Sequence, residues 1–415
     1  MPASLAPLRH RSFALALSAN FISSVGGFMQ TVALGVYLTE TTHDPLWLGL
    51  ITLALWLPSL VASPLAGVAA DRHDRRRFIQ INNLIMAAST SVLAAVALAH
   101  RLHPWIACLL AVVEGFASAA AWPTYQSLVP ELVGRDEVLA AVSLSSAQFN
   151  LGRVIGPLVA GLVLSVASPA WCFVANAVSF LVVVVAFAFV RVEHVVRAPD
   201  AASWAERMAT GVRRAWSIQG CRYPILTVMA VAFTVGPFIS LVPAMAIDVL
   251  HAGRLGTAWL VTAQGVGAVI AALTLPTLAR RTSRALVLRL AMITVVLAEA
   301  LYGLAPSLLG AAGALMLLGA GYIGVMTGLN TSVQLHAPAR ERSRILSLYT
   351  MSLSIAYPLG AFLQSVLARS VGLRTVTVGA ALLAGLGLAA MATRAPGYWR
   401  AFASGAEGVP AALAD

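Results

Sequence analysis

The sequence predicts an all-α membrane protein with twelve transmembrane helices arranged as two six-helix halves. Two observations lead to this fold class. Of the 415 residues, 59% are hydrophobic and only 10% are charged, with a mean hydropathy of +0.85. A soluble domain carries about 25% charged residues. The apolar residues also gather in segments of the roughly 20-residue length that a spanning helix needs.

The order of these apolar segments predicts the domain organisation. The longest internal polar stretch, 191–222, falls between the sixth and seventh segments. It divides the chain into an N-terminal half, a linker, a C-terminal half and a tail, at 1–190, 191–222, 223–393 and 394–415. The predicted spans are 12–38, 45–69, 77–99, 104–128, 141–165, 170–190, 223–247, 256–279, 285–304, 307–332, 345–368 and 373–393.

The linker contains a basic amphipathic segment, "SWAERMATGVRRAWS". On a helical wheel its tryptophans and small apolar residues share one face, and its charged residues share the other. Such a helix lies on the membrane surface beside anionic lipid headgroups. We interpret it as a strap that joins the two halves; a regulatory or partner-binding role is the alternative.

The basic residues predict the orientation of the chain. All 27 are arginine, and most fall on the side of the amino terminus in the twelve-span arrangement. Only Arg101, Arg254, Arg369 and Arg374 fall on the other side, and Arg153 lies within a span. An excess of positive charge marks the cytoplasmic side. We therefore expect a multi-pass protein of the cell inner (plasma) membrane, with both termini cytoplasmic. The net charge of +11 then needs no nucleic acid partner.

Several kinds of chemistry lack the residues they need. A chain without lysine has neither a P-loop nor a Schiff-base residue. His100 and His103 lie close together but without further ligands, so no metal site is expected. There is no HExxH or GxSxG motif. We predict no enzyme activity and no cofactor. A polytopic membrane enzyme is the less favoured alternative.

One connection between spans is densely charged. In "LAGVAADRHDRRRF", residues 65–78, the run from Asp71 to Arg77 holds four arginines, two aspartates and a histidine. Gly67 allows close approach of another helix, and Asp71 suits the positively polarised start of a neighbouring helix. Arg72, Arg75 and Arg76 could bridge to acidic groups or lipid phosphates. Topology alone would explain the arginines, but not Gly67 and Asp71 at this spacing.

A second pattern lies in the fifth span, in "NLGRVIGPLVAG". Gly152 and Gly156 form a small-xxx-small face for close helix packing. Pro157 is expected to bend the helix. Helix packing alone would also select this pattern.

These two motifs resemble those of the major facilitator superfamily. The charged connection is similar to the superfamily's motif between spans two and three, except that Asp74 stands where the family often has glycine. The fifth-span pattern resembles the Gly-x-x-x-Gly-Pro motif of proton-coupled exporters. The segments "WPTYQSLVPELVGRDEVLAAVSLSSAQFNLGRVIGP" and "NTSVQLHAPARERSRILSLYTMSLSIAYPLGAF" look like the drug:proton antiporter branch, which includes macrolide and siderophore (enterobactin-type) exporters.

The resemblance implies export of a small molecule, driven by proton entry through alternating access. It also implies that the charged connection locks the halves together on the cytoplasmic side. One departure from the family's pattern limits which residue roles the resemblance implies for this chain. Where related exporters have Arg-x-x-Gln-Gly in span four, this chain reads Ala111-Val-Val-Glu114-Gly115. The arginine often tied to proton coupling is missing.

Ionisable residues within spans are candidates for that coupling. Glu114 and Arg153 are predicted at a similar depth, about 15–18 Å into a core roughly 30 Å thick. They could form a pair that controls protonation; a purely structural ion pair is the alternative. Glu299, in the ninth span, is a second candidate for proton coupling. Asp248, at a helix end, is interpreted as a cap or loop contact.

Polar and aromatic side chains within spans are candidates for a substrate cavity. Each could equally serve helix packing, but as a set they favour a lipophilic or amphipathic substrate. We predict an exporter of such molecules with protons, membrane lipids and the substrate as partners, acting as a monomer. A facilitator-fold importer or a lysolipid flippase is the alternative. The cavity candidates are Asn20, Gln30, Gln148, Phe149, Asn150, Phe233, Phe238, Gln264, Tyr322 and Asn330.

Overall fold

The structure is a computed structural model, and it describes residues 3–62, 74–191, 212–338, 341–394 and 397–402. Within these ranges the regular elements are all helices. Eleven of the helices are long and apolar enough to cross a membrane, and Leu46–Ala62 is a shorter apolar helix. The predicted all-α membrane fold is therefore confirmed, with twelve apolar helical segments in the order that hydropathy predicts.

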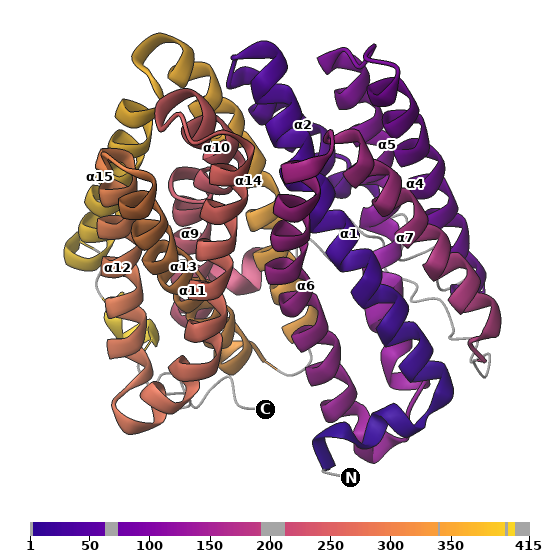
Figure 1. Cartoon of the computed structure of the whole chain (residues 1–415). Coiled ribbons are helices and arrows are strands. Elements are labelled where there is room, and N and C mark those ends of the chain that lie inside the picture. Colours follow the sequence, from indigo (N-terminus) through magenta and orange to yellow (C-terminus); the bar gives the residue numbers. More distant parts are fainter. Residues whose placement is uncertain (1–2, 63–73, 192–211, 339–340, 395–396, 403–415) are drawn as a thin grey trace. The chain divides into compact units, whose positions relative to one another are not determined.

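The chain divides into two compact units. Unit 1 comprises residues 1–200 and 246–262, and unit 2 comprises residues 201–245 and 263–415. In unit 1, α1 lies beside both α6 and α7, and α4 lies between α5 and α7 (Figure 1). Its first elements are η1 (Ala3–Arg9), α1 (Arg11–Thr42), α2 (Leu46–Trp56), α4 (Arg75–Leu98), α5 (Pro104–Leu128), η2 (Val129–Glu131), η3 (Arg135–Glu137), α6 (Val138–Val166) and α7 (Ala170–Phe189).

Unit 2 repeats this kind of packing. In it α12 lies against α13 and α15, and α9 lies against α13 and α14. The helix α11 begins in unit 1 and continues into unit 2. The elements from residue 219 onward are α9 (Gln219–Thr234), α10 (Phe238–Ala244), η4 (Met245–Val249), α11 (Gly253–Arg281), α12 (Arg284–Leu304), α13 (Leu308–His336), α14 (Arg342–Val371), α15 (Leu373–Arg394) and η5 (Trp399–Phe402).

The predicted spans agree closely with these helices. The span at 104–128 matches α5 residue for residue. Two predicted spans are interrupted: α2 ends at Trp56, and the seventh span is divided into α9, α10 and η4. The remaining differences, at the ends of α1 and α13 and at the start of α9, amount to at most about one helical turn. These helices run past the apolar core into more polar sequence, which hydropathy does not report. Residues 63–69 of the second predicted span lie outside the described residues.

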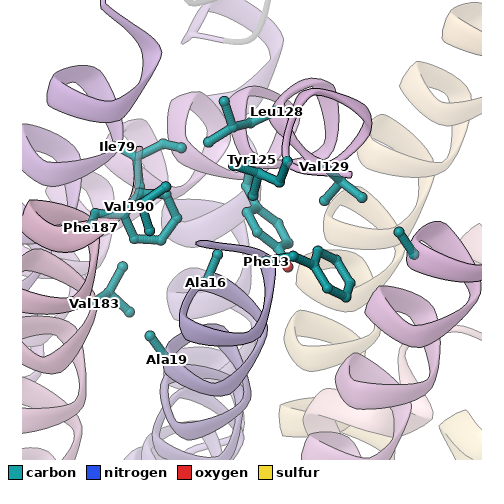
Figure 2. Packing of buried hydrophobic residues seen from close by; sticks show 12 residues of the cluster. Phe13, Ala16, Ala19, Ile79, Tyr125, Leu128, Val129, Val183, Phe187 and Val190 are labelled. Carbon is teal, nitrogen blue, oxygen red and sulfur yellow. The ribbon is translucent and has the colours of Figure 1, made fainter. Parts of the chain in front are cut away.

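Unit 1 has a core in which large side chains lie against small ones. Phe13, Tyr125 and Phe187, from α1, α5 and α7, are buried together near Ala16 and Ala19 (Figure 2). Lipid tails are as apolar as these side chains, so the hydrophobic effect does little to drive helices together within a membrane. Close van der Waals packing does this instead, and alanine and glycine permit it.

Side chains cap several helices at their first turns. Asp74 stands immediately before α4 and accepts hydrogen bonds from the backbone amides of Arg76, at 2.9 Å, and Arg77, at 3.4 Å. Ser283 and Ser307 cap α12 and α13 in the same way. A carboxylate at an N-cap satisfies amides that lack intrahelical partners and suits the positive end of the helix dipole. The departure from glycine at Asp74 therefore has a local structural reason.

Replacing Asp74 by alanine should loosen the first turn of α4. Loss of an N-cap costs about 1 kcal/mol, so amide exchange in residues 75–80 should quicken about fivefold where exchange follows local opening. Hydrogen-exchange mass spectrometry measures this directly. Asp74→Ser, which keeps a capping oxygen, is the matched control and should stay near the wild-type rate. Equal exchange in Asp74→Ala and wild type would contradict the capping role.

The connection between α10 and α11 belongs to unit 1, although the residues on both sides of it belong to unit 2. Two polar contacts hold it to the end of α1. The guanidinium of Arg254 donates to the Glu40 carboxylate at 2.7 Å, and His43 Nδ1 lies 2.8 Å from Asp248. Asp248 thus makes the kind of loop contact expected for it. Hydropathy alone does not predict this attachment.

The chain after α15 folds back onto unit 2. Tyr398 is 1% exposed and shares a hydrogen bond with the Thr227 hydroxyl at 3.0 Å. Ser332 of α13 donates to the carbonyl oxygen of Ala401 at 3.0 Å. Arg289 lies over the Trp399 ring, 4.1 Å from its centre. Residues 397–402, within the predicted tail, are therefore part of the packed unit.

Candidate functional site

A chain of polar side chains, buried except for the partly buried Glu114, crosses unit 1 from α5 through α1 to α7. Glu114 accepts a hydrogen bond from Gln30 Nε2 at 2.8 Å. Gln30 Oε1 accepts from Asn176 Nδ2 at 2.7 Å, and Asn176 Oδ1 accepts from the Ser179 hydroxyl at 2.9 Å. Gln30, Asn176 and Ser179 are at most 4% exposed. We call these four residues the Glu114 network.

The backbone of α1 makes room for this network at Gly26. A Cβ atom on Gly26 would lie 2.5 Å from both Asn176 Oδ1 and Ser179 Oγ, closer than such atoms approach. The neighbouring Gly27 has nothing within 4 Å of the same position. The absence of a side chain at Gly26 thus allows the α7 polar groups to lie directly against α1.

The hydrogen bonds of the network share one direction. Ser179 donates to Asn176, Asn176 donates to Gln30, and Gln30 donates to Glu114. Consecutive bonds of this kind polarise one another. Among the described residues, the Glu114 carboxyl group therefore accepts from one neutral donor, Gln30, which is itself bonded to Asn176.

Gln30 holds the Glu114 carboxyl group in the structure, and the predicted pairing of Glu114 with Arg153 stays a prediction. Among the described residues, the hydrogen-bond partner of Glu114 is Gln30. Helix packing accounts for the Gln30 contact: α6 packs on α1 through its small-residue face, and α1 brings Gln30 to the Glu114 carboxyl group. The depth of a residue within the membrane predicts neither which helices pack together nor which side chain lies beside Glu114.

Glu299, the second predicted carboxyl group, lies in the interior of unit 2 on α12. It is 1% exposed, and within the described part of the chain neither carboxyl oxygen has a hydrogen-bond partner. The hydroxyl group of Tyr302, one turn further on, likewise has no partner there. A buried carboxyl group without partners is costly in its charged form. Its role in proton coupling stays a prediction.

The α6 motif packs as its spacing predicts. A Cβ on Gly152 would lie 2.7 Å from the Ser24 side chain, and one on Gly156 would lie 2.6 Å from that of Phe28. Both contacts are with α1, so the small-xxx-small face allows two backbones to approach closely. Pro157 follows within the same helix and is buried. The motif thus holds α6 against the helix that carries Gln30, while its role in antiport stays a prediction.

The charged connection is described only from Asp74 onward. Gly67, Asp71 and Arg72 lie outside the described residues. Arg75 forms an ion pair with Glu131, and Arg76 donates to the carbonyl oxygen of Val190 at 3.2 Å. These arginines therefore tie the start of α4 to the ends of α5 and α7 within unit 1.

Some predicted cavity residues contact their own helix, and others contact a different helix. Asn20 and Asn150 each donate to a carbonyl one turn earlier in their own helix, and Asn330 accepts from Gln334. Phe149 lies edge-on against Phe28, and Phe238 lies edge-on against Tyr322.

Two other predicted cavity residues are buried glutamines. Gln148 has no partner for either amide atom within the described residues, and Gln264 has none there for Nε2. Such groups are available to water or to a polar part of a substrate. Phe233 is partly buried, and its carbonyl oxygen lies 3.4 Å from Gln364 Nε2.

Sequence reasoning missed Asn176 and Ser179. A signal was present, because Asn176 is an amide side chain in the middle of the strongly apolar α7, where a polar group needs a partner.

Among the residues that the structure describes, no three His, Cys, Asp or Glu side chains come together as metal ligands would.

The fold and these motifs agree with comparisons to known proteins. The model of the transmembrane secretion effector family matches residues 2–404. The chain therefore belongs to this family of the major facilitator superfamily, whose members are multi-pass membrane transporters. The multidrug efflux pump Tap of Mycolicibacterium fortuitum is 27% identical over 379 residues, which cover 86% of this chain and 90% of that protein.

Two further relatives match over shorter segments. The staphyloferrin A transporter of Staphylococcus aureus is 27% identical over 168 residues, 40% of this chain and 42% of that protein. Macrolide efflux protein A of Streptococcus pyogenes is 30% identical over 145 residues, 35% of this chain and 36% of that protein. In both cases the matched segment spans less than half of the relative's length.

Solved structures agree with the fold. The nucleoside transporter NupG gives a TM-score of 0.71 at 14% identity, covering 94% of this chain and 99% of that chain. A bacterial homolog of the human lysosomal transporter Spinster gives 0.72 at 15% identity, with 97% of each chain covered. At this identity the likeness concerns the fold alone.

Proposed function

We propose that this protein exports small lipophilic or amphipathic organic molecules in exchange for protons, by alternating access. It would do so in the cell inner membrane. The observation that carries the proposal is the Glu114 network, in which an ionisable group within a transmembrane helix is hydrogen-bonded to the neutral Gln30 and, through it, to Asn176 and Ser179. The similarity to efflux and siderophore transport proteins supports the direction and the class of substrate.

The network suggests how proton binding could be linked to movement of helices. A carboxyl group that gains a proton becomes a donor as well as an acceptor. Its remaining oxygen still accepts from Gln30, while the new O–H needs an acceptor of its own. If Gln30 turns its amide to accept from that O–H, the bonds from Asn176 and Ser179 change with it. Glu114, Gln30 and Asn176 lie on α5, α1 and α7, so protonation alters contacts among three helices.

The exporter proposal is tested by efflux from a host without its own pumps. Cells producing the protein receive a panel of antibiotics, dyes and siderophores, with and without a proton ionophore. We expect at least one compound to leave faster, and the ionophore to abolish the difference. Export that persists after the proton gradient collapses would contradict antiport. Uptake in place of efflux would favour an importer, and flux of lysolipid alone would favour a flippase.

Membrane orientation forms part of this proposal and has its own test. Reporters fused after Ala198 and Arg400 should report the cytoplasm, because arginine-rich segments stay on that side. Reporters after Thr42 and Ser307 should report the outside. A cytoplasmic signal at Thr42 would contradict the proposed topology.

A further inference from the structure

Unit 2 contains a cavity that is separate from the Glu114 network. Its volume is about 610 Å³, and it is lined by the later part of α11, the start of α12, the second half of α13 and η5. Phe402, from the segment that folds back after α15, forms part of its wall. A cavity of this size holds a small organic molecule.

The polar groups of this cavity are mostly hydrogen-bond donors or cations. Arg280 and Arg284 line it together with the Thr327 and Thr331 hydroxyls and the His336 imidazole. His336 Nδ1 donates to the carbonyl oxygen of Ser332 at 2.8 Å, which leaves Nε2 for another partner. The rest of the wall is largely apolar and includes leucine side chains of α11 and α13.

The two cavity arginines have no acidic partner within the described part of unit 2. Two carboxyl groups occur there, on Glu299 and Glu341. Glu299 is buried in the interior of α12, and Glu341 is paired with Arg214 at 3.1 Å. None of the ion pairs among the described residues involves Arg280 or Arg284. Both side chains are exposed, so their guanidinium groups are accessible to an anion from outside these residues.

We propose that this cavity binds an amphipathic organic anion, with a carboxylate or phosphate group at Arg280 and Arg284 and an apolar body against the leucines. Guanidinium groups hold such anions through paired, charge-assisted hydrogen bonds. Topology alone would place arginines at this helix connection, but it would not need the hydroxyl groups or a cavity beside them. The anion could be a membrane phospholipid or a dissolved substrate, since both present this chemistry.

Binding is measured by calorimetry on the purified full-length chain in detergent, with octanoate, short-chain phosphatidylglycerol and octanol as probes. We expect one or both anions to bind and octanol to bind much more weakly. Replacing Arg280 and Arg284 together by glutamine should weaken anion binding at least about tenfold. Arg281→Gln is the matched control, because Arg281 is adjacent in sequence but does not line the cavity. It should leave binding unchanged.

The outcomes separate the two sources of the anion. Binding of the phospholipid alone assigns the cavity to a lipid headgroup, and binding of octanoate alone assigns it to a dissolved anion. Joint replacement of Arg280 and Arg284 by lysine should keep part of the affinity, which separates loss of charge from loss of fold. The proposal is overturned if neither anion binds, if octanol binds as tightly, or if Arg281→Gln has the same effect as the double glutamine variant. No transport is measured, so the result is independent of proton coupling.

Discussion

Glu114→Gln is expected to abolish accumulation of substrate against its gradient while leaving substrate binding and exchange in place. The amide group matches the protonated acid in size and can still hydrogen-bond to Gln30. It cannot release a proton, so the cycle loses its link to the proton gradient. In vesicles with an imposed pH gradient, the accumulation ratio of labelled substrate should fall to about one. Exchange of labelled for unlabelled substrate should continue near the wild-type rate.

Glu114→Asp is the control for this variant. It keeps an ionisable group at the same site but shortens its reach to Gln30, so part of the accumulation should survive. Loss of exchange as well as accumulation in Glu114→Gln would indicate damage to the fold or to substrate binding. Full accumulation in Glu114→Gln would place coupling elsewhere, with Glu299 as the next residue to replace.

Gly26→Ala is expected to disrupt the Glu114 network without touching its titratable group. The new methyl group would lie 2.5 Å from Asn176 Oδ1 and Ser179 Oγ, so both side chains must move. Overpacking of this kind costs about 1–3 kcal/mol, and a buried amide left without its partner costs a similar amount. Coupled transport should fall by about tenfold to a hundredfold, measured per molecule of protein in the membrane.

The adjacent glycine provides the control. Gly27→Ala adds the same methyl group to the same helix, where nothing lies within 4 Å of it. Its transport should stay close to that of the wild type. Similar losses in both variants would show that α1 tolerates no methyl group in this turn, and the specific role of Gly26 in the network would be refuted.

The fold was largely predictable from the sequence because one physical requirement dominates it. Each span must satisfy its backbone polar groups internally and bury apolar side chains in lipid, so segment length and hydropathy locate the helices. Attachments outside the spans were less predictable. Tyr398 lies in a short aromatic segment that reads as a tail, and only the packed unit reveals Thr227 as its partner. The contact of Arg254 with Glu40 joins residues far apart in the chain.

The candidate site was predictable only in part, because Glu114 and Gln30 were singled out from the sequence whereas Asn176, Ser179 and the pairings were not. Rarity of ionisable groups within spans identifies Glu114 from the sequence alone. The partner of Glu114 depends on which helices pack together and on how each helix is rotated about its axis. Hydropathy reports neither. Depth suggested Arg153, whereas helix packing supplies Gln30. Gly26 illustrates the same limit, because its function is defined by side chains of α7 that lie about 150 positions later in the sequence.

The central claim, that substrate export is exchanged for protons through Glu114, is tested most directly by substrate-induced proton movement in proteoliposomes. A pH-sensitive dye inside the vesicles reports proton flux when substrate is added to the outside, at several pH values. We expect the wild-type protein to move protons in the direction opposite to the substrate, and Glu114→Gln to move substrate without any proton signal. A proton signal in Glu114→Gln equal to that of the wild type would contradict the claim.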